Sequence, residues 1–259
     1  MREPLRPFIE AFIEQRVASA GTDTPYRRPL VGFAAAGDPM WQRLKAIAEP
    51  THLLPDDLLP GARTVIALFV AFDESVVHAN RRGESTAREW AIAYIETNRL
   101  INRIAGDLKT HLASRGVRSA VQPSTHNWNP ETLVSAWSHK SAAAIAGLGS
   151  FGLHRMLITD LGCAGRCGSL VIDAELASTS RPQLERCLHF SNGSCGLCVK
   201  ACPANAMRVA AAGEMNLDKF RCYDHLLHRA TQHLQLPELA DCCGKCATAG
   251  PCALRSAVQ

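Results

Sequence analysis

The chain has 259 residues, of which 47% are hydrophobic and 20% are charged, so it can bury a core as one large domain or two smaller ones. The formal net charge of +4 is spread over 28 basic and 24 acidic residues with no dense Lys/Arg block, which gives no indication of a nucleic-acid partner. No apolar run is long enough to span a bilayer, and the first residues lack the basic-then-apolar order of a secretory signal, so we expect a soluble, cytoplasmic protein without a membrane partner.

The first 175 residues alternate predicted helices and strands. Residues 7–18 have apolar side chains at helical spacing, which predicts an amphipathic helix. A turn-rich stretch with three prolines and a glycine follows, and it leads into a short predicted helix over residues 41–47. Residues 64–72 are β-prone and almost wholly apolar, and the absence of polar alternation predicts a strand covered on both faces.

The longest predicted helix covers about residues 87–114. Thr86 and Glu89 have the spacing of a capping box at its start, and Gly116 can end it. A stripe of large side chains recurs along this segment at helical intervals, formed by Trp90, Tyr94, Ile101, Ile104, Leu108 and Leu112. Helices bury themselves through such stripes, so a core role is favoured over contact with a cofactor. A strand over residues 117–121 is expected next.

Residues 138–159 contain a helix of small residues, then three glycines, then an apolar strand. The spacing of Gly147, Gly149 and Gly152 is that of a dinucleotide-binding turn, but such a turn follows a strand and opens a helix, which is the opposite order. The three glycines therefore either let the backbone approach a bulky cofactor or simply turn the chain. We treat them as candidate cofactor-binding residues.

Cys163 and Cys167 lie one helical turn or one loop apart, ahead of the main group of cysteines. They could bind a metal, form a redox pair, or be small buried residues. We favour a structural role because the later cysteines already suffice for two clusters.

Nine of the 11 cysteines fall between Cys187 and Cys252. At their centre the chain reads Cys-Gly-Leu-Cys-Val-Lys-Ala-Cys-Pro over residues 195–203, which is the close of a bacterial ferredoxin motif. In two-cluster ferredoxins the cysteine before the proline binds the other cluster. The spacing therefore predicts an electron-handling protein with two 4Fe-4S clusters.

Two clusters held only by cysteine need about eight thiolates, and the region supplies them. Applying the crossing rule, we assign one cluster to Cys187, Cys195, Cys198 and Cys252, and the other to Cys202, Cys222, Cys243 and Cys246. A standard motif would have a cysteine three residues before Cys195, but Asn192 stands there, so Cys187 must reach in across a short loop. Cys187 is the least certain ligand, and Cys242 could exchange roles with Cys243.

Two other uses of the cysteines remain open. A four-thiolate zinc site could form from the Cys195/Cys198 and Cys243/Cys246 pairs, although their separation exceeds that of a zinc ribbon and three further cysteines would be idle. A disulfide framework fits a small secreted protein better than this chain. Iron-sulfur clusters are the favoured interpretation.

The order of these motifs resembles the epoxyqueuosine reductases and their relatives, among which are the corrinoid-dependent reductive dehalogenases. The matching pieces lie in family order at residues 59–66, 146–152, 168–169, 195–203 and 243–246. The resemblance implies an α+β fold, with a nitroreductase-like and cobalamin-binding-like domain over residues 1–180. It implies a small, mostly helical, ferredoxin-like two-cluster domain over residues 181–259, and possible binding of a cobalamin.

Three departures from the family pattern bear on function. Characterised members of the family carry an acidic proton donor shortly before the Ala-Gly-Leu-Gly segment, whereas residues 133–140 have no carboxylate and Glu131 lies just outside them. His139 or Lys140 could donate the proton instead, and both are also plausible surface residues. The usual Gly-Lys-Asn after the glycines is replaced by Gly-Leu-His at residues 152–154, and the helical-repeat domain of the tRNA-acting members is missing, which argues against direct action on tRNA.

The favoured interpretation is an iron-sulfur oxidoreductase of the epoxyqueuosine reductase-like group. Electrons would come from a reduced ferredoxin or flavodoxin, pass through the two 4Fe-4S clusters, and reach a corrinoid that acts on a small-molecule substrate. The alternative is a non-catalytic two-cluster protein that transfers electrons to a partner enzyme, which the missing carboxylate supports. A hollow cleft beside one cluster would favour the enzyme, and a filled one the carrier.

Overall fold

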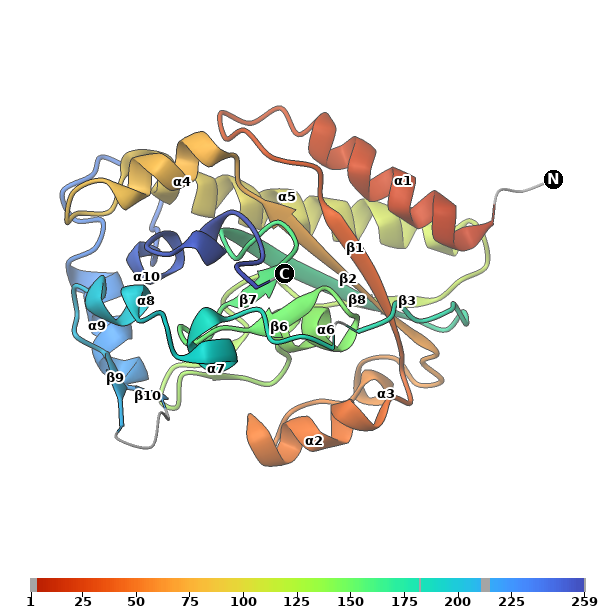
Figure 1. The fold of residues 1–259 in the computed structure, drawn as a ribbon. Helices are drawn as coiled ribbons and strands as arrows, with labels where there is room; N and C mark the ends of the chain where they lie inside the picture. Colours follow the sequence, from red (N-terminus) through yellow and green to blue (C-terminus); the bar gives the residue numbers. More distant parts are fainter. Residues whose placement is uncertain (1–3, 182, 211–214, 259) are drawn as a thin grey trace.

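A four-stranded antiparallel sheet forms the centre of the molecule in the computed structural model, which describes residues 4–181, 183–210 and 215–258 (Figure 1). The strands lie in the order β1 (Leu30–Ala35), β2 (Thr64–Ala71), β8 (Gly165–Ile172) and β3 (Ser119–Val121). Phe33 pairs with Ile66 between β1 and β2, and Ala67 pairs with Ser169 between β2 and β8. An α+β fold is thereby confirmed.

Strand β2 is buried along its whole length, as the apolar run predicts. Ile66, Leu68 and Val70 pack on one face of the sheet against α1 (Leu5–Ala18) and α5 (Arg88–Ala113). The alternate residues of β2 pack on the opposite face against α2 (Pro39–Ile47) and α6 (His139–Ile145). Side chains alternate across a strand, so an apolar residue at every position requires a layer of structure on each side.

Helix α5 carries the predicted stripe, but the predicted capping box does not form. Ala87 is the N-cap residue and provides no side-chain hydrogen bond, while its backbone N–H donates to Asn80 Oδ1 at 2.9 Å. Thr86 is buried and its hydroxyl interacts with the thiol of Cys243 instead. The contact of Thr86 with Cys243, which is distant in the sequence, therefore replaces the capping interaction that the local spacing predicts.

Strand β1 lies in the stretch for which the sequence indicates only turns. It forms because its backbone pairs with β2 along its length and because Gly32 permits a close approach to α6. A Cβ atom at Gly32 would lie 2.3 Å from the carbonyl oxygen of Ala146. The strand is stabilised by contacts with distant segments, which no local pattern reveals.

The second face of the sheet also carries several short elements. Helix α3 (Pro55–Leu58) precedes β2, and two small hairpins follow α5, namely β4 (Trp128–Asn129) with β5 (Val134–Ser135) and β6 (Gly149–Phe151) with β7 (Leu157–Thr159). The ring of Trp41 in α2 stacks on that of Trp137 with centroids 5.3 Å apart. These elements surround α6 and hold it against the sheet.

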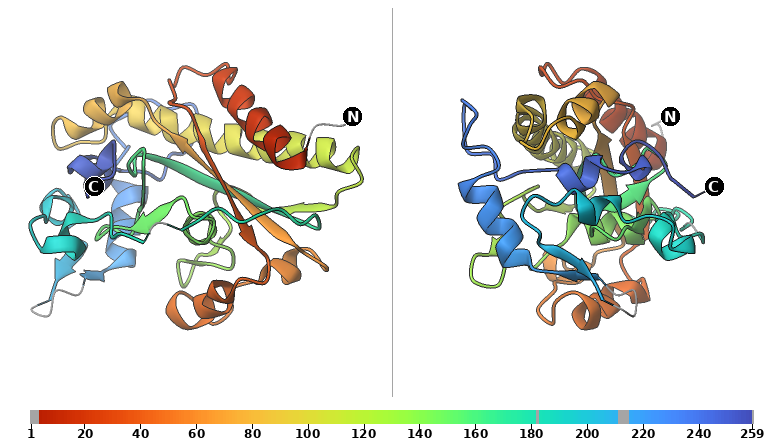
Figure 2. Two further views of the ribbon diagram at one scale, coloured as in Figure 1. Left: turned by 45° about the vertical axis from the view of Figure 1, so that its right-hand side comes forward. Right: turned by 60° about the vertical axis from the view of Figure 1, so that its left-hand side comes forward.

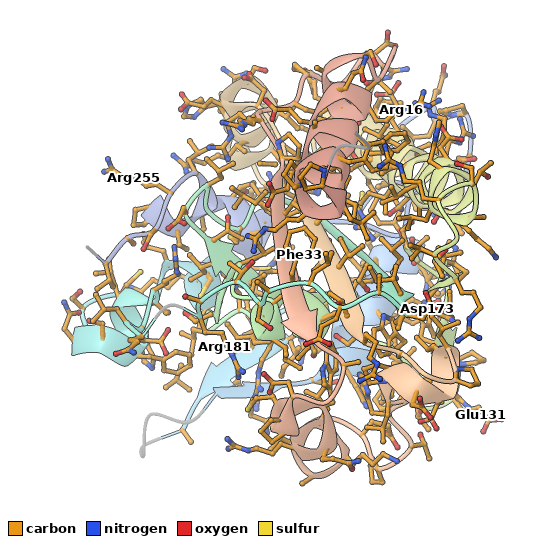
Figure 3. All side chains as sticks on the ribbon, turned by 90° about the vertical axis from the view of Figure 1, so that its right-hand side faces the viewer. Arg16, Phe33, Glu131, Asp173, Arg181 and Arg255 are labelled. Carbon is orange, nitrogen blue, oxygen red and sulfur yellow. The ribbon has the colours of Figure 1, made fainter. Side chains whose placement is uncertain are left out.

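The segment after residue 173 crosses the outer edge of the sheet before it reaches the cysteine-rich region. Figure 3 shows it running from Asp173 past Phe33 to Arg181. The backbone N–H of Thr179 donates to the carbonyl of Phe33 at 2.8 Å, and Arg181 pairs with Asp38. The domain boundary at residue 180 stays a prediction, and it falls at the end of this crossing segment.

The cysteine-rich region packs at one end of the sheet, beside α4 (Glu74–Arg81) and the start of α5 (Figures 1 and 2). It consists of short elements, which are α7 (Leu188–Asn192), α8 (Leu197–Lys200), β9 (Met207–Val209), β10 (Met215–Leu217), α9 (Lys219–His228), α10 (Lys245–Thr248) and the 3-10 helix Pro251–Ala253. Lys245 anchors it to the end of α4 by donating to the carbonyl oxygens of Asn80, Arg82 and Gly83. Within the described residues we find no helix with an apolar stretch long enough to cross a bilayer.

Candidate functional site

Four cysteines from three short segments border one small cavity. Cys187 precedes α7, Cys195 and Cys198 lie at α8, and Cys252 lies in the 3-10 helix near the C-terminus. Burial raises the pKa of the Cys198 thiol to about 11, with contributions from electrostatic interaction with Cys252, Cys187 and Cys195. The structure therefore brings together the four cysteines that the crossing rule groups, and we call them the first thiol set.

The loop that carries Cys187 explains how the irregular spacing is accommodated. Helix α7 ends at Asn192, and Gly193 adopts a left-handed conformation with φ of 73° while its N–H donates to the carbonyl of His189. Glycine takes this conformation without a steric penalty. The turn returns the chain toward Cys195, which leaves Cys187 beside Cys198 although Asn192 occupies the usual ligand position.

The other four assigned cysteines border a second cavity of about 200 Å³. Cys202 follows α8, Cys222 lies in α9, and Cys243 and Cys246 lie at the start of α10. Burial raises the pKa of Cys222 to about 11, with contributions from the neighbouring Cys202 and Cys243. Burial also raises the pKa of Cys246, with contributions from the other three thiols. We call these four the second thiol set.

Cys242 is buried on the wall of the same second cavity. Burial raises its pKa to about 12, and its electrostatic neighbours are Arg166, Asp241 and Cys243. Cys243, by contrast, interacts with Cys202 and contributes to the shifts of both Cys222 and Cys246. The placement favours Cys243 over Cys242 as the fourth member of the second thiol set.

Cys163, His154 and Cys252 form a tight group whose ligand atoms all lie within 4.8 Å of one another. His154 Nε2 lies 3.5 Å from Cys163 Sγ and 3.6 Å from Cys252 Sγ. Interaction with the Cys163 thiol lowers the pKa of Cys252, with His154 contributing, and the same interaction raises the pKa of Cys163, whose thiol also donates to the carbonyl oxygen of Ala247 at 3.4 Å. These contacts favour a thiolate at Cys252 and give Cys163 a supporting role, whereas Cys167 lies apart beside Lys140.

A third cavity, of about 250 Å³, adjoins the second. The two cavities share Met156, Cys163, Gly165 and Arg166 as lining residues. Phe69, Trp128 and Trp137 form apolar walls of the third cavity, and no aspartate or glutamate is among its described lining residues. We call it the substrate cavity, for the role proposed below.

The two candidate proton donors, His139 and Lys140, both border the substrate cavity, but they differ in burial and in hydrogen-bond partners. His139 is buried, and its Nδ1 and Nε2 atoms lie 2.7 Å from Ser169 Oγ and 2.8 Å from the carbonyl oxygen of Pro123. Lys140 is half-buried and donates from Nζ to the carbonyl oxygen of Arg155 at 3.1 Å. Glu131, the nearest carboxylate in the sequence, is exposed at the periphery (Figure 3). A proton-donor role for either residue stays a prediction.

Burial lowers the pKa of His139, which predicts a measurable pH dependence of stability. In the unfolded chain, His139 becomes protonated near pH 6.5, which is above its pKa in the folded protein. Below about pH 6.5 the unfolded state therefore binds more protons than the folded state. The free energy of unfolding should therefore fall as the pH decreases from about 6.5, until the folded pKa is passed. Denaturant titrations at a series of pH values should show a shallower fall for His139→Gln.

His52 and His225 also have lowered pKa values, so the variant should retain part of the fall. Identical slopes for the wild type and His139→Gln would contradict the buried neutral imidazole.

The three glycines of residues 147–152 contact the protein's own chain. A Cβ atom at Gly149 would lie 2.1 Å from the carbonyl oxygen of Ile158, and one at Gly147 would lie 2.6 Å from that of Ser180. Gly152 has the side chains of Ile158 and His154 at similar range. Packing inside the chain thus accounts for all three glycines, none of which lines the three cavities described above. Their contact with a cofactor stays a prediction.

Tyr94 and Arg166 border the second cavity, although no motif in the sequence marks either as a site residue. The guanidinium carbon of Arg166 lies 4.4 Å from the centroid of the Tyr94 ring. The Tyr94 hydroxyl donates to the carboxylate of Asp241, and burial raises the tyrosine's pKa to about 12. A hydroxyl in an otherwise apolar helical stripe needs a polar partner, and that signal could have marked Tyr94.

Comparison with known proteins reveals similarity of fold. No family model matches the chain, and no curated protein matches it. The epoxyqueuosine reductase of Bacillus subtilis superposes with a TM-score of 0.59 at 20% identity, covering 96% of this chain and 66% of the reductase. An epoxyqueuosine reductase bound to an epoxyqueuosine-modified tRNA stem loop gives 0.59 at 18% identity, with the same coverage.

A catabolic reductive dehalogenase in complex with 3-bromo-4-hydroxybenzoic acid gives a TM-score of 0.58 at 18% identity, covering 100% of this chain and 38% of the dehalogenase. The chain thus spans slightly less than two thirds of the reductases and a smaller part of the dehalogenase. It shares its fold with regions of both groups, which confirms the resemblance at the level of fold.

Proposed function

We propose that the chain is an iron-sulfur oxidoreductase that passes electrons through two 4Fe-4S clusters to a redox centre beside the substrate cavity. The observation that carries this proposal is the gathering of eight cysteines into two sets of four, each around its own cavity. Cys246 of the second set also interacts with Cys198 of the first, so the sets are neighbours. Neighbouring clusters suit stepwise electron transfer.

The spacing of the thiols supports clusters over zinc. Zinc–sulfur bonds of about 2.3 Å hold four thiolates within about 4 Å of one another. Among the described residues, the one group of three ligand atoms that lie within 4.8 Å of one another is His154, Cys163 and Cys252. No three described thiols of either set lie within 4.8 Å of one another. Ligands around an iron-sulfur cube are spaced more widely than the ligands of one zinc ion.

We further propose that a corrinoid binds in the substrate cavity, against the wall that it shares with the second cavity. The structure of a reductive dehalogenase with this fold suggests a mechanism for B12-dependent dehalogenation in that enzyme. The flat side chains of Phe69, Trp128 and Trp137 suit one face of a macrocycle, and the polar residues of the same lining suit the amide groups at its rim. His139 has partners for both ring nitrogens, so the walls would hold the corrinoid without an imidazole ligand from that residue.

A bound corrinoid would supply a low-potential metal for reductive chemistry. The chain's own residues would position and tune the components. The Cys163 thiol and His154 ring stabilise negative charge on Cys252, and hydrogen bonds to cluster sulfurs raise a cluster's reduction potential. A ferredoxin or flavodoxin would supply the electrons, and a small molecule would be reduced.

Cofactor uptake tests this proposal. Protein purified anaerobically with cobalamin supplied, then passed through a desalting column, should keep a cobalt absorption spectrum and about one cobalt per chain. Substituting Gly165 by leucine should reduce uptake, because a Cβ atom there already meets Val70 and Phe69 at the shared wall. Leu239→Ala, a change at an exposed residue, is the matched control. Two intact clusters without cobalt retention would contradict a corrinoid enzyme.

The second candidate is a two-cluster electron carrier that serves a partner enzyme. The substrate cavity of about 250 Å³ is slightly smaller than the usual range for ligand sites, and it has no carboxylate among its described lining residues to act as a proton donor. A cobalt-free protein whose clusters still exchange electrons with a ferredoxin would favour the carrier.

A further inference from the structure

Two cations from different elements border the substrate cavity without a carboxylate partner. Lys140 lies in α6, and Arg166 lies in β8 opposite Val70. In the part of the chain that the structure describes, neither cation forms an ion pair with an aspartate or glutamate. The arrangement is unusual because half-buried cations are normally neutralised by a nearby anion.

Arg166 is only partly satisfied by the protein. Its Nε atom is buried and has no hydrogen-bond partner among the described residues. Its guanidinium lies over the ring of Tyr94 at 4.4 Å, a contact that orients the planar group without using its N–H donors. An oriented guanidinium with free donors at a cavity wall is suited to binding a planar oxyanion through two hydrogen bonds.

Lys140 adds a second positive charge to the same space. Burial lowers its pKa, and the charge of Arg166 lowers it further, so the two cations destabilise each other. Two thiols interact with Lys140. Cys167 stays uncharged at neutral pH because burial raises its pKa to about 12, and Cys246 belongs to the second thiol set. A ligand anion between the two side chains would relieve this repulsion.

The remaining walls indicate the rest of the ligand. Phe69, Trp128 and Trp137 supply flat apolar surfaces, while Ser124, Thr125 and Asn127 supply neutral polar groups. Asp241 borders only the neighbouring cavity and is engaged by the Tyr94 hydroxyl and by His126, whose Nε2 atom lies 3.6 Å away. The cavity therefore combines positive charge with aromatic walls.

We propose that the substrate cavity binds a small, planar organic carboxylate, with its carboxylate group held between Lys140 and Arg166. This inference rests on the proposed function, since it names the substrate class of the same cavity. It concerns recognition and leaves the reduced bond unassigned.

Binding of benzoate and benzamide to the anaerobically purified full chain tests the proposal, because the two compounds share shape but differ in charge. In ligand-observed NMR titrations benzoate should bind at least about tenfold more tightly than benzamide, as expected for a charge-assisted contact. Arg166→Gln and Lys140→Gln should each weaken benzoate by on the order of tenfold to a hundredfold and leave benzamide unchanged. Lys109→Gln, which removes an exposed lysine away from the cavity, should change neither affinity.

Circular dichroism and iron content identify any variant that fails to fold. If Arg166→Gln fails, Arg166→Lys, which keeps the charge but loses the planar fork, should weaken benzoate by less than about tenfold and leave benzamide unchanged. Equal affinities for benzoate and benzamide, no binding of either, or benzoate binding that is insensitive to both substitutions would overturn the proposal. The test is separable from cofactor uptake. Protein that retains cobalt but does not bind benzoate contradicts this inference alone, and protein that binds benzoate without retaining cobalt contradicts only the corrinoid.

Discussion

The single substitutions Cys198→Ala and Cys246→Ala should each remove about half of the iron, which falls from about eight to about four atoms per chain. Cys198 belongs to the first thiol set and Cys246 to the second, so each substitution removes one ligand from one cluster. Iron and acid-labile sulfide analysis, with electron paramagnetic resonance of the reduced protein, measures the loss and identifies the remaining cluster.

The chain offers matched controls for this prediction. Cys167→Ala removes a thiol that borders neither thiol set, and it should leave the iron content unchanged. Cys242→Ala should also keep the iron, whereas Cys243→Ala should lose the second cluster, because Cys243 interacts with Cys202 and with Cys222. Full iron retention by Cys198→Ala or Cys246→Ala would contradict the assignment. Iron loss in Cys242→Ala alone would show that Cys242 and Cys243 exchange roles.

Substitution of Gly162 by alanine should destabilise the protein and disturb Cys252. Gly162 has φ of +80° and approaches the backbone of Ala253 so closely that an added Cβ atom would lie 2.3 Å from its carbonyl oxygen. The N–H groups of Cys163 and Ala164 donate to the carbonyl oxygens of Cys252 and Ala253, so the turn at Gly162 holds the C-terminal segment in place. The expected loss of stability is about 1–3 kcal/mol from the left-handed backbone and about 1–3 kcal/mol from overpacking.

Gly116→Ala separates these two contributions. Gly116 has φ of +81°, but nothing lies within 4 Å of a Cβ atom added there. Denaturant unfolding of cluster-loaded protein should therefore show the backbone contribution alone for Gly116→Ala and the larger loss for Gly162→Ala. Iron content should fall in Gly162→Ala and stay constant in Gly116→Ala. Equal losses of stability with full iron in both variants would contradict the proposed link between the turn and Cys252.

Elements whose signal is local could be predicted from the sequence. In β2 the apolar run, and in α5 the periodic stripe, directly indicate which residues are buried. The positions of both elements could therefore be predicted to within one residue or so. Strand β1 could not, because it depends on pairing with β2 and on the space at Gly32. The capping box at Thr86 was wrong for a similar reason, since that side chain contacts the distant Cys243.

The candidate site divides in the same way. The spacing of residues 195–203 and the crossing rule group the eight cysteines as the structure does, including Cys187. The roles of His154 and Arg166 could not be anticipated, because they arise from contacts between segments far apart in the chain. His154 contacts Cys252, which lies 98 residues later, and Arg166 contacts the Tyr94 ring on another element. A set of ligands defined by residue spacing can be recognised in the sequence, whereas a contact between two distant segments cannot.

The stoichiometry of iron and acid-labile sulfide in the anaerobically purified wild-type protein tests the central claim most directly. Two 4Fe-4S clusters predict about eight irons and about eight sulfides per chain. About four irons would mean that only one thiol set holds a cluster, and zinc without sulfide would contradict the iron-sulfur assignment altogether.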